Sequence, residues 1–384
     1  MKCEWESSKI GDLGKIITGK TPPTKNQDLW DGNIPFITPR DLQNGKTVLC
    51  TERTITSNGI KVMQSVKLPP KSVCVSCIGN IGYVAMTRSE CISNQQINSI
   101  IVNSNNDADF VYYLMKSLHS TFKNYEGQST TLSILNKKHF SDIDICIPPL
   151  DIQKQIAAIL SALDEKIAIN RALNDNLADL LQTIYQGRFS NDILAVNQGV
   201  LSDICSYSTD KVAVSELNVR TYFSTENMLS GKAGSTEATS LPTTSQTTAC
   251  HKGDTLISNI RPYFKKIVYC EDKCGCSTDV LCFTPSQPCY SAYLFSTLYA
   301  DKFFAFMVAG SKGTKMPRGD KQQIMTYPVV LPSEEELAGF NTIASPLLEQ
   351  IYSNRAENKR LSILRDTLLP KLMSGEINVS AIQL

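Results

Sequence analysis

The chain has 384 residues, which is too long for one ordinary hydrophobic core and indicates two domains, or two copies of one domain with connectors. Its 38 Lys and Arg nearly balance 37 Asp and Glu, so the overall charge does not by itself indicate nucleic acid or an anionic membrane as a partner. No run of about 18 uncharged apolar residues occurs, and the acidic start Met1–Glu6 lacks an apolar targeting segment, so we expect a soluble, cytoplasmic protein. The 13 cysteines are scattered and odd in number, which favours reduced thiols over disulfides.

Residues 1–150 form the first predicted domain. Short apolar runs bounded by turn residues, 72–78 and 97–102, predict strands, and 110–118 predicts a short helix. This mixture is typical of an α+β domain.

Residues 151–194 contain the first of two long predicted helices. Apolar and Asn residues recur there at alternating steps of four and three, which is the spacing of a coiled-coil seam. The seam positions are Ile156, Leu160, Leu163, Ile167, Asn170, Asn174, Leu177, Leu181 and Ile184.

Residues 195–333 repeat the mixed texture and form a second predicted domain. A strand is expected at 255–258 and a helix at 292–306, whereas 229–250 is rich in Ser, Thr, Gly and Ala and predicts a long mobile loop, not a strand.

Residues 334–384 contain the second long helix, with Arg365 interrupting its seam. The seam positions are Phe340, Ala344, Leu347, Ile351, Asn354, Asn358, Leu361 and Leu368. We expect the two helices to pack on each other, with the Asn residues fixing their register at some cost in stability. The alternative is that these Asn residues face solvent on two ordinary amphipathic helices.

The sequence contains an internal duplication. Residues 163–177 match 347–361 at an offset of 184, and Ile147–Pro149 matches Val330–Pro332 at an offset of 183. Both copies run in the same order, from a mixed domain through a proline-bearing exit to a helix.

Several apparent catalytic or metal-binding motifs lack the context that they need. The segment 14–21 matches the phosphate-loop pattern GxxxxGK[ST], but the prolines that follow suit a turn and not the required helix. Cys74 and Cys77 have zinc-knuckle spacing without a second such pair, and Cys270, Cys274 and Cys276 do not supply one, so no metal site is expected.

The histidines do not indicate hydrolytic chemistry either. None of the three, His119, His139 and His251, is set beside a plausible nucleophile or carboxylate pair. A glycine fingerprint for a methyl-donor cofactor is also missing. We therefore expect no catalytic residues in this chain.

Charge is distributed unevenly along the sequence. The two predicted domains, 1–150 and 195–333, carry net charges of +3 and +2, and the helical segments 151–194 and 334–384 carry −2 each. This small excess supports DNA contact only where a few cations gather in one place.

The sequence resembles the specificity subunits of type I restriction-modification systems. The resemblance covers nearly the whole chain and rests on the segments 33–42 (NIPFITPRDL), 77–84 (CIGNIGYV), 94–101 (NQQINSII), 253–267 (GDTLISNIRPYFKKI), 151–185 and 334–375. It implies two target-recognition domains, 1–150 and 195–333, and spacer helices in 151–194 and 334–384 that form an antiparallel coiled coil. It also implies a prokaryotic, non-catalytic subunit that binds double-stranded DNA and docks methyltransferase subunits, two of them, and it leaves a restriction or translocase subunit open. Methyl donor and ATP are expected on those partners.

Polar and cationic side chains near strand ends and loops are the expected DNA contacts. They are Lys20, Lys25, Thr38, Arg40, Lys46 and Asn80 in the first domain, and Asn259, Arg261, Tyr263, Lys265, Lys266, Lys312, Lys315 and Arg318 in the second. Arg can bridge a guanine edge and Asn an adenine edge, while Lys mainly contacts phosphates. Each can alternatively be an ordinary solvated charge, and Arg261 can buttress the turn at Pro262.

A helix from Ile156 to Ile184 would be roughly 43 Å long, at about 1.5 Å per residue. That length predicts two domains about one turn of B-DNA apart and a bipartite target with a fixed gap. The competing interpretation is a duplicated protein-interaction scaffold that never touches DNA. A stand-alone nuclease or methyltransferase would need an acidic metal cluster or a methyl-donor loop, and the sequence shows neither.

Overall fold

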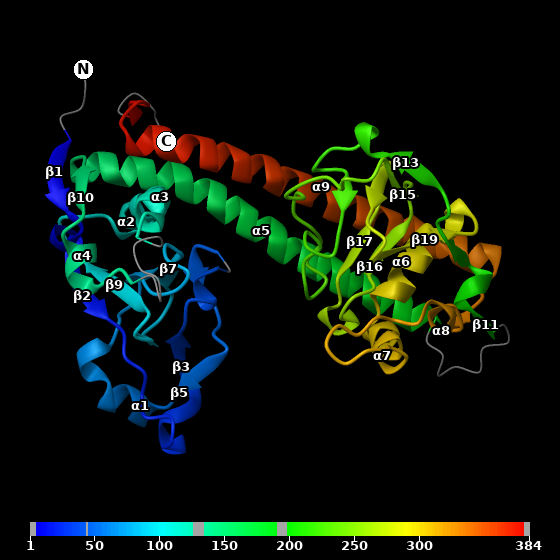
Figure 1. Cartoon of the computed structure of the whole chain (residues 1–384), viewed down its shortest axis with the longest axis horizontal. Coiled ribbons are helices and arrows are strands. Elements are labelled where there is room, and N and C mark those ends of the chain that lie inside the picture. Colours follow the sequence, from blue (N-terminus) through cyan, green and yellow to red (C-terminus); the bar gives the residue numbers. More distant parts are fainter. Residues whose placement is uncertain (1–4, 44, 126–133, 190–197, 380–384) are drawn as a thin grey trace. The chain divides into compact units, whose positions relative to one another are not determined.

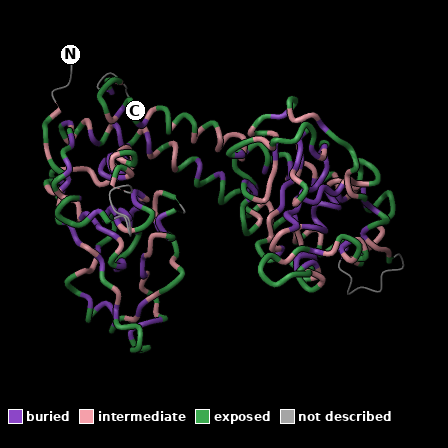
Figure 2. The backbone as a smooth tube through the Cα atoms, in the orientation of Figure 1, coloured by how far each residue is buried: buried purple, intermediate pink, exposed green. Residues whose placement is uncertain are grey.

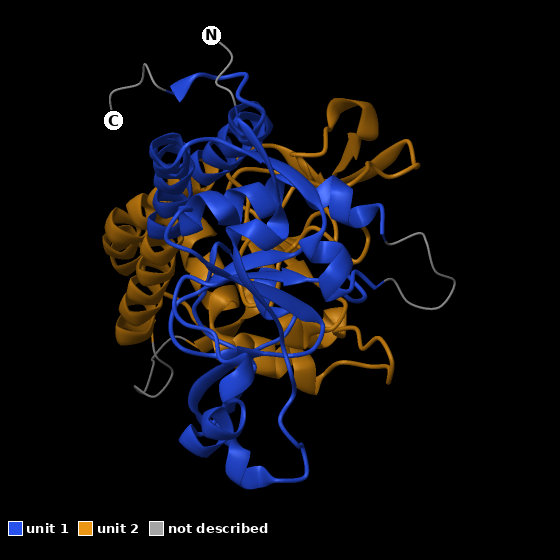
Figure 3. Ribbon diagram, turned by 90° about the vertical axis from the view of Figure 1, so that its left-hand side faces the viewer, with its two compact units in different colours: residues 1–169, 357–384 blue, residues 170–356 orange. Residues whose placement is uncertain are grey.

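The computed structural model describes residues 5–43, 45–125, 134–189 and 198–379. The chain divides into a first unit, residues 1–169 with 357–384, and a second unit, residues 170–356 (Figure 3). The boundary between predicted segments at 194 and 195 lies outside the described residues.

The first unit contains a five-stranded sheet of order β2-β9-β6-β7-β4, a three-stranded sheet of order β5-β3-β8, and the antiparallel pair β1-β10 (Figure 1). The strands are β1 Glu6–Lys9, β2 Gly14–Thr18, β3 Trp30–Ile37, β4 Thr47–Val48, β5 Arg53–Ile55, β6 Val73–Ser76, β7 Val84–Thr87, β8 Ile92–Ser93, β9 Ile97–Val102 and β10 Asp144–Ile147. The short helices are α1 Ser57–Val62, α2 Ala108–Ser117, α3 His119–Lys123 and α4 Lys137–Ser141.

Helix α2 packs on β6 and β7 and closes the main core of this unit. Asp107 caps the helix by accepting a hydrogen bond from the N–H of Phe110 at 2.8 Å, which satisfies one of the free donors of the first turn. The same core includes Leu160 of the first long helix and Leu369 of the second. Since burying a leucine side chain contributes about 2 kcal/mol, the ends of the long helices are part of this domain's fold.

The second unit contains two four-stranded sheets, β12-β19-β16-β17 and β13-β15-β18-β14, and the antiparallel pair β11-β20. The strands are β11 Gln198–Val200, β12 Cys205–Tyr207, β13 Lys211–Ala213, β14 Tyr222–Phe223, β15 Gln246–Cys250, β16 Thr255–Ser258, β17 Ile267–Tyr269, β18 Cys274–Cys276, β19 Val280–Pro285 and β20 Pro328–Val330. The short helices are α6 Ser291–Tyr299, α7 Asp301–Ala309 and α8 Lys321–Met325.

Aromatic side chains fill the core of the second unit beside α6. The ring of Phe189 lies 4.9 Å from that of Tyr293 and 5.3 Å from that of Phe340, both nearly edge to face, an arrangement that adds to the stabilisation from burial. Figure 2 marks such buried segments in purple within each unit. As in the first unit, the long helices supply part of the core.

The two long helices are α5 (Leu150–Phe189) and α9 (Glu334–Met373). Ser333 and Glu336 start α9 with a capping box, in which the N–H of Glu336 donates to the Ser333 hydroxyl and the N–H of Ser333 donates to Glu336. Within the second unit, Asn174 pairs with Asn354 and Phe189 with Phe340, so numbering rises in one helix as it falls in the other. The expected antiparallel pairing is confirmed.

The predicted seam is largely buried. The buried seam residues are Ile156, Leu160, Ile167, Asn170, Asn174, Leu181, Phe340, Ala344, Ile351 and Asn354. Leu163, Leu177, Ile184, Leu347, Asn358, Leu361 and Leu368 are half-buried. Leu348 and Leu369, each one residue beyond a predicted position, are buried more deeply, because a seam spaced at 3.5 residues drifts around a helix of 3.6 residues per turn.

The duplication appears in the strand order of the two units. The order β2-β9-β6-β7 in the first unit recurs as β12-β19-β16-β17 in the second, antiparallel throughout, and β1-β10 recurs as β11-β20. The connection between β6 and β7 therefore corresponds to that between β16 and β17.

The strands expected at 72–78, 97–102 and 255–258 and the helix at 110–118 are confirmed, but two local expectations were wrong. Residues 246–250 of the supposed mobile loop form β15, because β13 and β18 hydrogen-bond to both of its edges. The helix expected at 292–306 is two helices separated by the extended residue Ala300. The phosphate-loop look-alike is followed by a turn at residues 24–25 and not by a helix, as expected.

Lys46 was expected on the DNA surface, but its side chain is only 15% exposed. Its ammonium group lies 2.5 Å from an Asp109 oxygen, donates to the hydroxyl of Ser161 at 2.6 Å, and sits 4.9 Å from the ring centre of Tyr113. These partners come 63 or more residues later in the sequence, so local pattern could not reveal them. Lys46 ties the sheet of the first unit to α5.

Asp164 and Arg365 extend this network across the helix pair within the first unit. Arg365, which interrupts the apolar seam, donates to one oxygen of Asp164 at 2.6 Å, and the Tyr113 hydroxyl donates to the other at 2.7 Å. Burial and the adjacent Asp164 raise the pKa of Tyr113, so its hydroxyl remains a donor. The positive charge of Arg365 in the helix seam is thus paired with a carboxylate inside the protein.

The hydrogen bond between the amide of Asn354 and Asn174 (2.9 Å) is buried, and it supports a stability prediction. Asn354→Ala leaves the Asn174 oxygen without this donor and should lower the free energy of unfolding by about 1–3 kcal/mol in urea titrations. Asn176→Ala, at an exposed position of α5, is the matched control. Equal stability of the two variants would show that the pair does not hold the register.

A second prediction concerns Lys46. Lys46→Met removes the cation between Asp109 and Ser161 and should lower the free energy of unfolding by about 1–3 kcal/mol, while the salt dependence of DNA binding stays unchanged. Lys20→Met, at an exposed position, is the control in urea unfolding. If Lys46→Met has the stability of the wild type and its DNA binding depends less on salt, Lys46 contacts DNA instead of supporting the fold.

Candidate nucleic-acid interface

The connection between β16 and β17 in the second unit is an unusual turn. Arg261 and Lys265 have left-handed backbones, with φ of 51° and 50°, on either side of the 3₁₀ turn Pro262–Phe264. Residues with a Cβ adopt this conformation at a cost of about 1 kcal/mol each, so surrounding contacts must hold it. Such positions occur often at binding sites.

Neighbouring backbone provides those contacts. The N–H of Arg261 donates to the carbonyl of Pro317 at 2.8 Å, and the N–H groups of Gly231 and Lys232 donate to Phe264 and Lys265. Three segments that are distant in sequence are therefore joined at one loop.

The segment after α7 forms a small hairpin beside this turn. Lys312 and Arg318 exchange backbone hydrogen bonds of 2.8 and 2.9 Å, and Gly313, with φ of 102°, allows the chain to reverse. Ile260 forms a bridge with Arg318. Lys312, Lys315 and Arg318 are all exposed on the hairpin.

Most cations of this surface are paired with surface carboxylates. Arg318 lies 3.1 Å from Asp279, and Lys312 lies 2.5 Å from Asp320 and lowers the pKa of that carboxyl by its hydrogen bond. Exposed ion pairs contribute only about 0–1 kcal/mol, so a phosphate can displace them. Lys315 makes no such pair with any described residue.

Four predicted site residues of this unit are partly or wholly interior, and one of them is the half-buried Arg261. Asn259 is buried, and its side-chain oxygen has no hydrogen-bond partner in the described part of the chain. Lys266 donates to the carbonyl of Thr225 at 2.6 Å, and burial lowers its pKa. Lys265 is half-buried and pairs with Asp301 at 2.9 Å.

In the first unit the predicted residues are more dispersed. Lys20, Lys25 and Asn80 are exposed, and Asn80 lies in the β6–β7 connection that corresponds to the β16–β17 turn. Thr38 is held by Asp41, to which its hydroxyl donates at 2.7 Å, and Arg40 is exposed 3.7 Å from Glu52. The hydrogen bonds and sheet pairings described for this unit do not join them into one surface.

Sequence reasoning named Tyr263 but missed Phe264 and Met316, which are also exposed here. The rings of Tyr263 and Phe264 have centroids 4.7 Å apart. The sequence did contain a signal for these aromatic residues, the run Pro-Tyr-Phe among lysines and arginines. Selecting residues by positive charge leaves such apolar side chains out.

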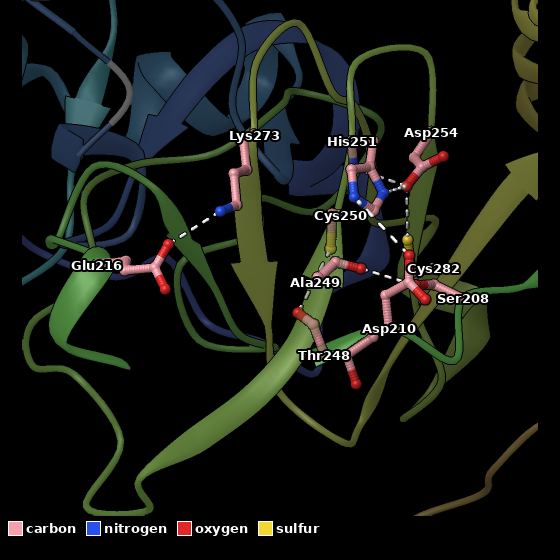
Figure 4. A network of polar contacts seen from close by, with 10 residues as sticks. All are labelled: Ser208, Asp210, Glu216, Thr248, Ala249, Cys250, His251, Asp254, Lys273 and Cys282. Atoms are coloured by element: carbon pink, nitrogen blue, oxygen red, sulfur yellow. Dashed lines mark hydrogen bonds and ion pairs between the residues drawn. The ribbon is translucent and has the colours of Figure 1, made fainter. Parts of the chain in front are cut away.

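The clustered cysteines of the second unit belong to a buried core with Met228, Leu256 and Val268. The Cys282 sulfur lies 3.3 Å from Asp254, which also accepts a hydrogen bond from the N–H of His251 (Figure 4). In the first unit, burial raises the pKa of Cys74 to about 11, which disfavours the thiolate that a metal would need. No group of three or more His, Cys, Asp or Glu among the described residues is arranged to hold a metal ion.

In the described part of the chain, no helix combines the length and the apolarity that crossing a bilayer requires.

Comparison with known proteins relates this architecture to one family. The model of the type I restriction modification DNA specificity domain matches residues 2–178. The type I restriction enzyme MjaIX specificity subunit of Methanocaldococcus jannaschii is 24% identical over 440 residues, covering 98% of this chain and 94% of that protein. The HindI specificity subunit of Haemophilus influenzae is 34% identical over 182 residues, covering 46% of this chain and 39% of that protein.

A solved structure shares the fold along the whole chain. The type I restriction-modification S subunit from M. genitalium superposes with a TM-score of 0.60 at 16% identity, covering 96% of both chains. The α+β class with two long helices is therefore confirmed. Residues 2–178 thus match the DNA specificity domain of type I restriction-modification systems, and nearly the whole chain is similar to a specificity subunit of such a system.

Proposed function

We propose that the chain recognises a bipartite duplex DNA target, with residues 1–150 binding one block of bases and residues 195–333 the other. The observation that carries this proposal is the joining of the β16–β17 turn to the 312–318 hairpin in the second unit. Cations from both segments are thereby presented together, as a phosphate backbone requires.

The residues divide by the role that their position permits. Lys312, Lys315 and Arg318 contact phosphates or guanine edges, because their charged ends are exposed. Arg261 has a buried Nε that no described residue pairs with, and we assign it to a base or phosphate that supplies an acceptor. Tyr263 and Lys265 line the same turn, whereas Asn259 and Lys266 support it from behind.

In the first unit, the proposed contacts are Lys20, Lys25, Thr38, Arg40 and Asn80. Asn80 follows Gly79, whose φ is 76°, in the β6–β7 connection. Its position matches the turn that carries Arg261. An amide at this site can form two hydrogen bonds with an adenine edge.

The long helices set the gap between the two blocks and carry the partner subunits. Helix α5 runs unbroken over 40 residues, which supports a spacer of fixed length. Each unit exposes apolar side chains on its helical segments: Ile169, Ile363 and Leu364 in the first, and Leu173, Leu180, Ile343 and Tyr352 in the second. Exposed apolar residues in both copies fit two methyltransferase subunits, one per copy.

The proposed setting is the cytoplasm of a prokaryotic cell. There, methyltransferase subunits supply the methyl donor site, and restriction or translocase subunits, where present, supply ATP binding.

The spacer role predicts a change in the target. Matched insertions of one heptad into α5, within 168–178, and into the facing part of α9 should widen the unread gap by about three base pairs, since a heptad adds about 10 Å. The complex with its methyltransferase is expressed in cells, and methylated adenines are mapped across the genome. If the insertion variant methylates the same split motif as the wild type, with the same gap, the spacer role is contradicted.

The surface cations predict a change in salt dependence. Lys312→Ala with Lys315→Ala should weaken binding to matched duplex and reduce the slope of log K against log salt by about 2, at about 0.9 per phosphate contact. Lys211→Ala with Lys252→Ala, also exposed in the second unit, is the matched control. If both double variants show the same slope of log K against log salt, the 312–318 hairpin does not contact DNA.

A further inference from the structure

An exposed apolar patch surrounds the β16–β17 turn. Outside the long helices, the described residues of the second unit expose five large apolar side chains, and all five belong to this turn or to segments adjoining it. They are Leu229, Tyr263, Phe264, Val308 and Met316. Tyr263, Phe264 and Met316 are 50%, 39% and 48% exposed.

Backbone contacts bring these segments together. Leu229 belongs to the loop whose Gly231 donates to the carbonyl of Phe264 at 2.8 Å. Met316 precedes Pro317, which accepts from Arg261. Helix α7, which contains Val308, packs against the turn. The patch is therefore carried by four parts of the sequence that adjoin one another.

The turn presents its two rings on a rigid support. The left-handed residues Arg261 and Lys265 reverse the chain on both sides of Pro262, which is buried. The ring planes of Tyr263 and Phe264 are inclined by 56° and in contact, so the pair forms a short, stiff projection. A wedge requires this property, because a flexible loop would fold back instead of entering a stack of bases.

The charged residues around the patch indicate which kind of partner binds it. Arg261, Lys265, Lys312, Lys315 and Arg318 belong to the same two segments as the exposed rings. Protein interfaces are depleted in lysine near their centres, whereas apolar side chains bordered by cations are typical of proteins that insert a wedge into duplex DNA.

We propose that Tyr263 and Phe264 form an aromatic wedge that enters one base step at the second half of the target, with Met316 against the neighbouring sugar or base. This inference rests on the proposed DNA recognition and adds the mode of contact. Opening a step is easiest at pyrimidine–purine sequences, so the second half-site is selected partly by how easily it deforms.

The first unit does not offer the same wedge. In the corresponding β6–β7 connection, Ile81 is buried, Tyr83 is half-buried, and Asn80 is the exposed side chain with hydrogen-bonding capacity. The two half-sites are therefore recognised differently: the first through base edges, and the second through base edges and distortion.

The test uses the complex with its methyltransferase and the target found by methylation mapping. Duplexes each carry one 2-aminopurine at successive steps of the two half-sites and their flanks, excluding the methylated adenines, which the methyltransferase itself extrudes. Insertion unstacks the probe and raises its fluorescence. We expect a rise at one step of the second half-site and none in the first.

Tyr263→Ala with Phe264→Ala should abolish this rise and weaken matched binding roughly tenfold or more, with an unchanged salt slope. Phe264→Leu keeps apolar volume and should retain part of the signal. Leu49→Ala, at an exposed apolar position of the first unit, is the control. Because both rings are exposed, the urea midpoint should stay that of the wild type.

Two results separate the wedge from DNA recognition itself. A wild-type complex that methylates a split motif, yet shows no rise at any probe or the same rise in the alanine variant, overturns the wedge alone. A wild-type complex without any sequence-specific methylation overturns both.

Discussion

Neither globular domain closes its own core without residues from the long helices. Leu160 and Leu369 lie in the core of the first unit, and Phe189 and Phe340 in that of the second. Each domain is therefore fastened to both helices by buried apolar surface, at about 25 cal/mol per Å². Such a junction bends or slides only if the domain core opens, and this property supports the spacer role proposed for the helices.

Polar pairs along the helices then fix which residues face each other. In the second unit Asn174 meets Asn354, and in the first Asp164 meets Arg365. An apolar seam tolerates slippage by a heptad, but slippage would leave these buried groups without partners. Buried polar groups cost stability relative to an all-leucine seam, and in exchange the observed antiparallel register pairs these four groups.

The sequence predicted what periodicity and duplication encode, namely the two helices, their seam and the α+β domains in between. It could not place side chains whose partners are remote. From the sequence, Lys46 resembles a surface cation, whereas in the structure Asp109 and Ser161 enclose it. Asn259, also expected at the surface, is buried. The left-handed turn at Arg261 was equally invisible, because no glycine marks it and backbone from residues 231 and 317 imposes it.

Two copies of one frame can recognise different sequences because the frame and the surface use separate residues. The order β2-β9-β6-β7 and its counterpart β12-β19-β16-β17 are kept by buried apolar strands. The turn that joins the last two strands of each set anchors itself with buried residues, Ile81 in one copy and Pro262 in the other, while Asn80, Tyr263 and Phe264 are exposed, so these three can change at small cost in stability. One copy exposes Asn80 in this connection and the other exposes two aromatic rings, and this difference supports the proposal that one half-site is read by hydrogen bonding and the other also by distortion.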